Sequence, residues 1–218
     1  MYTLVFDTTA KAVILGLYKG TSCVAKVEEF MEFGQAESLA VKVGEVLDKE
    51  GISFDEVGLL GVGVGPGSFT GVRASLAFAK ALGFARTDLL MTGVSSFEVY
   101  KEMLDEKNRA FYNAVVIETK REDFYFQLFD ENMNKLTEPL ALTREEIRDK
   151  IKARQVSFIG DGVERLLSVS MGLQIKTVEL TEMLDVQHLF EAVYKKYLEK
   201  SLDFPKPMYI RNADACVK

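Results

Sequence analysis

The chain has 218 residues, enough for one large domain or two small lobes with a substantial core. Hydrophobic residues make up 48% and charged residues 28%, as in soluble globular proteins, and no apolar run approaches the roughly 20 residues of a membrane helix. The net charge of −6 argues against a protein that grips nucleic acid unaided, because such proteins usually carry a basic surface that neutralises phosphates.

The N-terminal residues predict a strand over Tyr2–Phe6 and a turn at Asp7–Ala10, where Asp and Thr side chains can bond nearby backbone groups. No basic stretch precedes the apolar residues, so we expect no signal peptide. The two cysteines, Cys23 and Cys216, stand far apart and in no motif. We therefore expect a cytoplasmic protein with no membrane association.

From Val13 onward the pattern alternates between strands and helices. Two runs rich in apolar, β-branched residues lie on either side of Lys19-Gly20-Thr21 and predict a hairpin. Gly51 follows a helical segment at the position of a C-terminal cap. The predicted elements are two hairpin strands, a helix, a strand and a second helix: Val13–Tyr18, Cys23–Phe30, Glu37–Glu50, Val57–Val64 and Ser68–Ala85. This order indicates a mixed sheet covered by helices.

The polar stretch Lys101–Arg109 is typical of a linker, so we predict an N-terminal lobe over residues 1–104 and a C-terminal lobe over residues 105–218. Two prolines predict an extended tail at Pro205–Arg211. In between, the patterns predict a pair of strands and then three helices: Phe111–Ile117, Phe124–Asp130, Thr143–Ala153, Val163–Val169 and Val186–Lys200.

The most informative segment is the glycine-rich turn Gly61–Arg73. Glycines permit close backbone approach, Ser68 can cap the following helix, and a loop leading into a helix N-terminus is a natural anion site. The lysine of a P-loop is missing, and no dinucleotide fingerprint is present. Chemistry alone leaves two readings open, a phosphate site and a purely structural tight turn.

The helix after this turn has two apolar faces. One face can cover the sheet, and the alanines of the other suit close approach of a second helix. This second face consists of Ala74, Ala77, Phe78, Ala81 and Ala85. The preceding helix offers its own apolar face: Ala36, Leu39, Ala40, Val43, Val46 and Leu47. The two helices either satisfy each other inside the monomer or jointly present an interface.

Nine residues of the turn, Gly65–Arg73, resemble the hallmark of the bacterial TsaB family, also called YeaZ. Weaker similarities are spread along nearly the whole chain: Phe6-Asp-Thr-Thr9, Ala79-Lys-Ala-Leu-Gly83, Val94-Ser-Ser-Phe-Glu98 and Pro207-Met-Tyr-Ile-Arg211. The resemblance implies an α/β protein of the actin/Hsp70/sugar-kinase (ASKHA) fold, with two ribonuclease H-like lobes built on mixed sheets.

The resemblance also implies a function. Members of this family partner a larger paralogue, TsaD, which carries the metal and transfers a threonylcarbamoyl group to N6 of adenosine 37 in tRNAs that read codons beginning with A. A small ATPase, TsaE, joins the pair, and the family was once grouped with glycoproteases. We therefore expect a non-catalytic subunit that activates TsaD, reaches tRNA through the complex, and forms a homodimer when alone.

The chain departs from the family pattern in two places. Many members have His-Ser-Glu where this chain has Gln35-Ala36-Glu37, and Asp-Ala-Arg where it has Glu118-Thr-Lys120. These departures weaken any chemical role for the two segments. They leave a scaffolding role untouched.

The expected partner interface combines the two helices, with a four-helix bundle as the docking mode and Phe78 as an anchor. Its predicted residues are Ala36, Glu37, Leu39, Ala40, Val43, Leu47, Arg73, Ala74, Ala77, Phe78 and Ala81. Arg73 lies in the first turn of its helix, where the helix dipole disfavours a cation. A salt bridge to Glu37 or a contact with the partner would each explain this position.

The candidate phosphate or nucleotide contacts are Asp7, Thr8, Thr9, Gly67 and Ser68. An acid after the first strand helps to position a metal–nucleotide complex in proteins of this fold, whereas the structural alternative is a turn stabilised by its side chain. No tightly bound cofactor is expected, but ADP or ATP could be held at the partner interface.

Three further residues have both a structural and a functional interpretation. Asp161, in Gly160-Asp-Gly162, is predicted to cap the helix that follows. Arg211 is either a surface arginine or a contact to a partner or RNA. His188 is the only histidine, so the paired histidines of a metal site cannot exist here and no metal site is predicted. The competing functions are a nucleotide-binding enzyme of this fold and a glycoprotease-like hydrolase.

Overall fold

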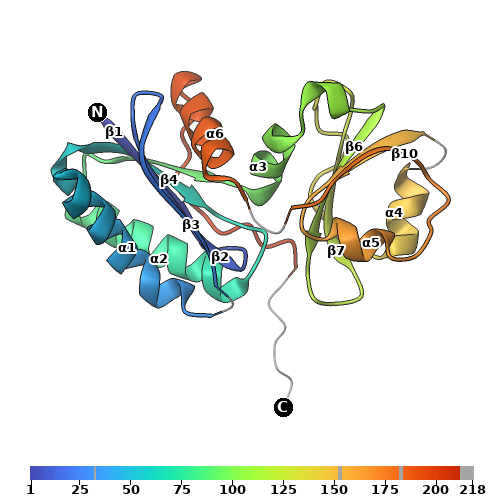
Figure 1. The fold of residues 1–218 in the computed structure, drawn as a ribbon, viewed down its shortest axis with the longest axis horizontal. Coiled ribbons are helices and arrows are strands. Elements are labelled where there is room, and N and C mark those ends of the chain that lie inside the picture. The colour runs from blue at the N-terminus through green and yellow to red at the C-terminus, as the bar shows by residue number, and fades with distance from the viewer. Residues whose placement is uncertain (32, 152–153, 182–183, 212–218) are drawn as a thin grey trace, which may run out of the picture. The chain divides into compact units, whose positions relative to one another are not determined.

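The computed structural model describes residues 1–211 apart from 32, 152–153 and 182–183 (Figure 1). Its contacts divide the chain into two units, Met1–Met103 with Glu182–Pro207 and Leu104–Thr181 with Met208–Lys218. The second unit thus differs from the predicted lobe 105–218, because helix α6 (Val186–Leu198) belongs to the first unit. It packs directly on the first sheet, where Val193 lies so close to Gly61 that no Cβ could fit there.

The first unit is built on a five-stranded sheet of order β3-β2-β1-β4-β5. The strands are β1 (Tyr2–Asp7), β2 (Ala12–Lys19), β3 (Ser22–Phe30), β4 (Val57–Gly63) and β5 (Leu90–Val94). β1 pairs antiparallel with β2 and parallel with β4, so the sheet is mixed, as predicted. The hairpin of β2 and β3 is confirmed, with Lys19 opposite Ser22.

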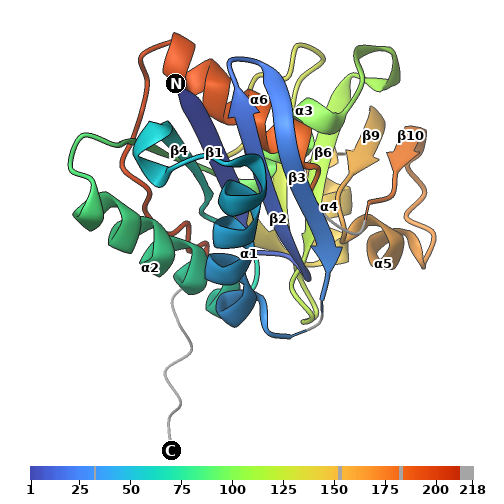
Figure 2. The ribbon, with the colours of Figure 1, turned by 60° about the vertical axis from the view of Figure 1, so that its left-hand side comes forward.

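Helices cover both faces of this sheet. α1 (Gln35–Glu50) and α2 (Phe69–Ala85) pack side by side on one face, as Figure 2 shows, while α6 and α3 (Ser96–Met103) lie on the other. The predicted caps are confirmed. Ser68 accepts a hydrogen bond from the Gly71 N–H, and Gly51 ends α1 in a left-handed conformation.

The second unit repeats the pattern with a five-stranded sheet of order β10-β9-β6-β7-β8. Its elements are β6 (Tyr112–Glu118), β7 (Phe124–Phe129), β8 (Leu140–Leu142), β9 (Gln155–Ile159), β10 (Gln174–Glu179), α4 (Arg144–Ile151) and α5 (Val163–Leu167). β6 pairs antiparallel with β7 and parallel with β9, as β1 does with β2 and β4. The two helices bury Ile147 and Leu166 against the sheet in a single apolar core.

The structure adds elements that the sequence patterns did not indicate. Residues 101–103, predicted as part of a linker, end α3, whose start carries a reciprocal cap between Ser95 and Glu98. Two 3-10 helices, Phe54–Glu56 and Glu106–Asn108, are also new. The end of the predicted helix 143–153 and Cys216 lie outside the described residues. Among the described helices, none is both long and apolar enough to cross a membrane.

Candidate functional site

The glycine-rich turn packs its backbone against the end of β1. The Ser68 N–H donates to the Thr9 carbonyl (2.7 Å), and a Cβ at Gly71 would collide with the carbonyl oxygen of Thr8. A Cβ at Gly67 would likewise collide with the carbonyl of Thr9. Glycine is therefore needed here for close approach of two backbones.

The polar side chains at the end of β1 are buried and bonded within the turn. Asp7 accepts hydrogen bonds from the backbone N–H (2.7 Å) and the hydroxyl (2.8 Å) of Thr9. The Thr8 hydroxyl donates to the Gly71 carbonyl (2.8 Å). Burial raises the pKa of the Asp7 carboxyl, although the hydrogen bonds from Thr9 oppose this rise. Asp7, Thr8 and Thr9 thus hold the turn together, whereas Gly67 is only half-buried and Ser68 is exposed.

The outer face of α1 and α2 contains most of the predicted interface. We define this outer face by the exposed or half-buried residues that point away from the sheet. The predicted residues that lie on it are Ala36, Glu37, Ala40, Arg73, Ala74, Ala77 and Ala81. Alanines at these positions leave the two helices open to close approach by other helices.

Three predicted interface residues face inward instead, and Phe78 is half-buried. Leu39, Val43 and Leu47 are only 1%, 4% and 7% exposed, so their assignment to an interface was wrong. They recur every four residues and form the one strongly apolar stripe of α1, which the sheet covers. The Phe78 ring is half-buried and lies 5.5 Å from the ring of Phe6, so it packs partly within the monomer, and its role as an anchor stays a prediction.

The sequence analysis missed the large apolar side chains on the same surface. Phe84, at the end of α2, is 85% exposed, and Phe33, just before α1, is 82% exposed. Val41 on α1 and Phe69 at the start of α2 are also exposed. The spacing of Phe84 from Ala77 and Ala81 on α2 was the signal that could have found it. Phe84 and Phe33 are the most exposed large apolar side chains in the part of the chain that the structure describes.

Arg73 has a partner other than the predicted one. Its guanidinium carbon lies 3.8 Å from the centre of the Phe69 ring, a cation–π contact within the first turn of α2. No ion pair joins it to Glu37, although the structure describes both side chains. Arg73 and Phe69 together form one end of the outer face.

In the second unit, the turn at the end of β6 is charged. Arg165 forms two hydrogen bonds with the carboxylate of Glu118, at 2.6 and 2.8 Å. Asp161 accepts from the Glu118 N–H (2.9 Å), and Gly162 rather than Asp161 caps α5, so the predicted capping role was wrong. The departure Glu118-Thr-Lys120 is therefore part of an ion-pair network.

The only histidine is engaged at a helix start. His188 Nδ1 lies 2.8 Å from Oδ1 of Asp185, the N-terminal cap of α6. Across the described residues, no three His, Cys, Asp or Glu side chains gather in a way that could hold a metal ion.

Comparison with known proteins places these features in a family. A model of the family described as "TsaD: tRNA N6-adenosine threonylcarbamoyltransferase" matches residues 34–215. The "tRNA threonylcarbamoyladenosine biosynthesis protein TsaB" of Haemophilus influenzae is 27% identical over 124 residues, which are 56% of this chain and 51% of that protein. The protein of the same name from Escherichia coli is 27% identical over 134 residues, 62% of this chain and 57% of that protein. The match thus spans little more than half the length of these relatives.

Solved structures agree on the fold. "YeaZ from Pseudomonas aeruginosa" has a TM-score of 0.78 at 20% identity and covers 95% of this chain and 99% of its own. A Bacteroides thetaiotaomicron protein described as having an "actin-like ATPase fold" has a TM-score of 0.50 at 10% identity, covering 89% of this chain and 95% of its own. Two mixed sheets of matching topology fit this actin-like, ASKHA-type architecture. The chain belongs to the family that the TsaD model describes, and it is similar in sequence to TsaB proteins and in fold to YeaZ.

Proposed function

We propose that the chain is a non-catalytic subunit that binds and activates a TsaD-type transferase in the formation of N6-threonylcarbamoyladenosine at position 37 of tRNA. The names of the relatives support the pathway. The outer face of α1 and α2 supports a binding role, because exposed phenylalanines beside a stripe of alanines form the kind of surface that partners cover. This outer face is the observation that carries the proposal.

The outer face fits a helical partner. Its alanines allow helices to pack closely, and Phe33 and Phe84 stand at its ends as anchors. The equivalent helices of the paralogue would complete a four-helix bundle. When the paralogue is absent, a second copy of the chain would cover the same surface as a symmetric homodimer. The two assemblies would then compete.

The chemistry is assigned to the partner. The chain has one histidine, so the paired histidines of a metal site must come from elsewhere. Asp7, Thr8 and Thr9 use their polar groups inside the turn. The isolated chain is expected to show no protease activity and negligible ATPase activity. Robust turnover by the purified chain that is abolished in Asp7→Ala would contradict this assignment.

The remaining partners would join through the complex. The net charge of −6 favours a catalytic partner as the main holder of tRNA, and a TsaE-type ATPase would add to the pair. Any ADP or ATP would be held where the partner meets this chain. Gly67 and Ser68 are the two candidate phosphate contacts that stay at the surface, next to the start of α2.

The substitution Ala77→Glu tests the docking surface. Ala77 is exposed, so the variant should fold with an unchanged melting temperature. In the complex the new carboxylate would be desolvated without a partner, which costs several kcal/mol, about a thousandfold in affinity. Pull-down or calorimetric titration with the TsaD-type paralogue measures this loss.

A matched control separates the outer face from exposed apolar surface in general. Leu198, on α6, is 64% exposed, so Leu198→Glu also places a carboxylate on the first unit, but on the opposite side of the sheet. This control should bind like the unmodified chain. A folded Ala77→Glu protein with full affinity, or an equal loss in both variants, would rule out the outer face as the docking surface.

A further inference from the structure

Three separate stretches of sequence meet where β6 turns into β7: the turn itself, helix α5 and the C-terminal segment. Glu118, at the end of β6, and Asp123, just before β7, belong to the turn, and Arg165 comes from α5. Arg165 donates to the Glu118 carboxylate and also to the Asp123 carbonyl (2.9 Å). The Thr119 hydroxyl donates to the same carbonyl (2.6 Å). The backbone at Asp123 is therefore fixed from two sides, which leaves its carboxylate in a defined position.

The third stretch is the C-terminal segment. The Arg211 guanidinium forms an ion pair with the Asp123 carboxylate, and it lies 5.7 Å from the centre of the Tyr125 ring. The two charged side chains are only 25% and 19% exposed. An ion pair that is partly shielded from water and backed by an aromatic ring is stronger than an ordinary surface pair. Arg211 is thus held within its own chain.

The same segment is fixed at its other end in the first unit. The Asp203 backbone carbonyl accepts a hydrogen bond from the Gly93 N–H (3.2 Å). Pro205 is buried, and its Cα lies 3.2 Å from the position that a Cβ of Gly93 would take. Lys196 donates to the Gly93 carbonyl (2.9 Å), which ties α6 to the same strand end. The chain passes from the first unit to the second after Pro207.

We propose that Arg211 and Asp123 form a latch that fastens the C-terminal segment to the second unit. The residues that follow Pro207 are then a strap within the second unit, and this pair holds the end of the strap against the β6–β7 turn. Breaking the ion pair frees one end of the strap while each unit keeps its own core. The role of Arg211 is therefore conformational, independent of any partner.

Limited trypsin digestion tests the latch, because trypsin must extract the Arg211 side chain to cleave after it. Lys206 precedes Pro207 and resists trypsin, so the released peptide Asn212–Lys218 reports cleavage at Arg211 alone. In Asp123→Asn, Arg211 stays in place but loses its charged partner. Mass spectrometry measures the rate at which the peptide is released. This rate should become about fivefold faster, since cleavage follows the population of the state in which Arg211 is detached.

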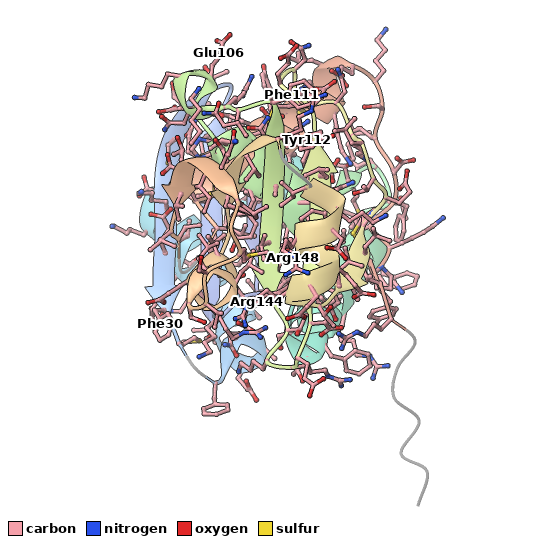
Figure 3. All side chains as sticks on the ribbon, turned by 90° about the vertical axis from the view of Figure 1, so that its right-hand side faces the viewer. Phe30, Glu106, Phe111, Tyr112, Arg144 and Arg148 are labelled. Carbon is pink, nitrogen blue, oxygen red and sulfur yellow. The ribbon has the colours of Figure 1, made fainter. Side chains whose placement is uncertain are left out.

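The control is Asp149→Asn, which removes the partner of Arg148 on α4 (Figure 3). This pair joins neighbouring residues of α4 in the same unit and is not part of the turn that holds Arg211, so peptide release should stay at the unmodified rate. Because Asp123→Asn could disturb its hydrogen bond with Thr119, Arg211→Lys provides a second variant that leaves the turn intact. The lysine keeps the charge but loses the fixed donor geometry of the guanidinium and its contact with the Tyr125 ring, so its rate, divided by that of a free peptide with the same change, should also rise.

The outcomes are distinct. Faster release in both latch variants, at unchanged melting temperature and with Asp149→Asn unaffected, supports the latch. Equal rates in the unmodified chain, Asp123→Asn and Arg211→Lys would overturn it. Equal acceleration in Asp149→Asn would overturn it too, because general loosening of the second unit would then explain the change.

Discussion

The two units place different chemistry at the same point of one topology. In each sheet the central strand is antiparallel to the strand after it and parallel to another, and an acidic residue ends that central strand. Asp7 ends β1 and is surrounded by hydroxyl groups, backbone and glycine. Glu118 ends β6 and pairs with Arg165.

The difference follows from how closely the next helix approaches. Gly67 and Gly71 let the start of α2 touch the β1 turn directly, so backbone carbonyls and hydroxyls satisfy one another and exclude water. In the second unit Gly160 also lies close to the Val116 carbonyl, but the start of α5 stands farther off, since a Cβ at Gly162 would lie 3.0 Å from the Ile117 carbonyl carbon. The pair of Arg165 and Glu118 is added at this junction. One fold thus holds two equivalent turns by close packing alone in one unit and by close packing together with an ion pair in the other.

The largest effect is expected from glycine substitutions that test close packing. In Gly71→Ala the new methyl would collide with the rigid carbonyl of Thr8, so the free energy of unfolding should fall by about 3 kcal/mol or more. In Gly162→Ala the methyl would lie 3.0 Å from the Ile117 carbonyl carbon, and the loss should be about 1 kcal/mol. Urea denaturation measures both. Equal losses would remove the distinction between the two turns.

A smaller effect is expected from neutralising the two acids. Glu118→Gln removes half of a partly exposed ion pair, so the free energy of unfolding should fall by about 1 kcal/mol at neutral pH. Asp7→Asn keeps an oxygen that accepts from Thr9 and removes a group whose ionisation burial opposes, so it should change stability little or raise it. Chemical denaturation of the two variants, each with its melting curve, gives the comparison. A larger loss in Asp7→Asn would show that the buried charge itself is needed.

The smallest effect is expected in how stability depends on pH, where Asp7 and Glu118 should contribute with opposite signs. The pKa of Asp7 is raised from 3.8 by burial, so its contribution to stability is full below 3.8 and is lost as the pH rises through the higher folded value. Burial opposes ionisation of Glu118 as well, but hydrogen bonds from Arg165 and the Lys120 backbone outweigh it and lower the pKa from 4.5. The contribution of Glu118 is therefore present above 4.5 and is lost as the pH falls.

Unfolding free energies measured from neutral to acid pH check this sign. On acidification, the free energy of unfolding of the unmodified chain should rise relative to that of Asp7→Asn. Over the same pH range, the stability advantage of the unmodified chain over Glu118→Gln should shrink. Parallel slopes in the two series would mean that the two acids share one environment after all.

The sequence by itself determined the elements whose signals are local. The hairpin of β2 and β3, the Ser68 cap and the Gly51 stop depend on neighbouring residues, so pattern and propensity predict them. The glycine motif identified the family, because nine specific residues with restricted backbone roles are rarely shared by chance. Short or edge elements such as β5, β8 and β10 escaped, since a few residues carry too little periodicity.

Only the tertiary structure decided which helix face is exposed to solvent and to which unit each segment belongs. Both apolar stripes of the α1–α2 pair look alike in sequence, but the sheet covers Leu39, Val43 and Leu47 and leaves Phe33 and Phe84 in solvent. Likewise, α6 returns to the first sheet, and Arg211 reaches Asp123 across many residues of intervening chain. These outcomes depend on contacts between residues far apart in sequence, and a local sequence pattern does not identify such contacts.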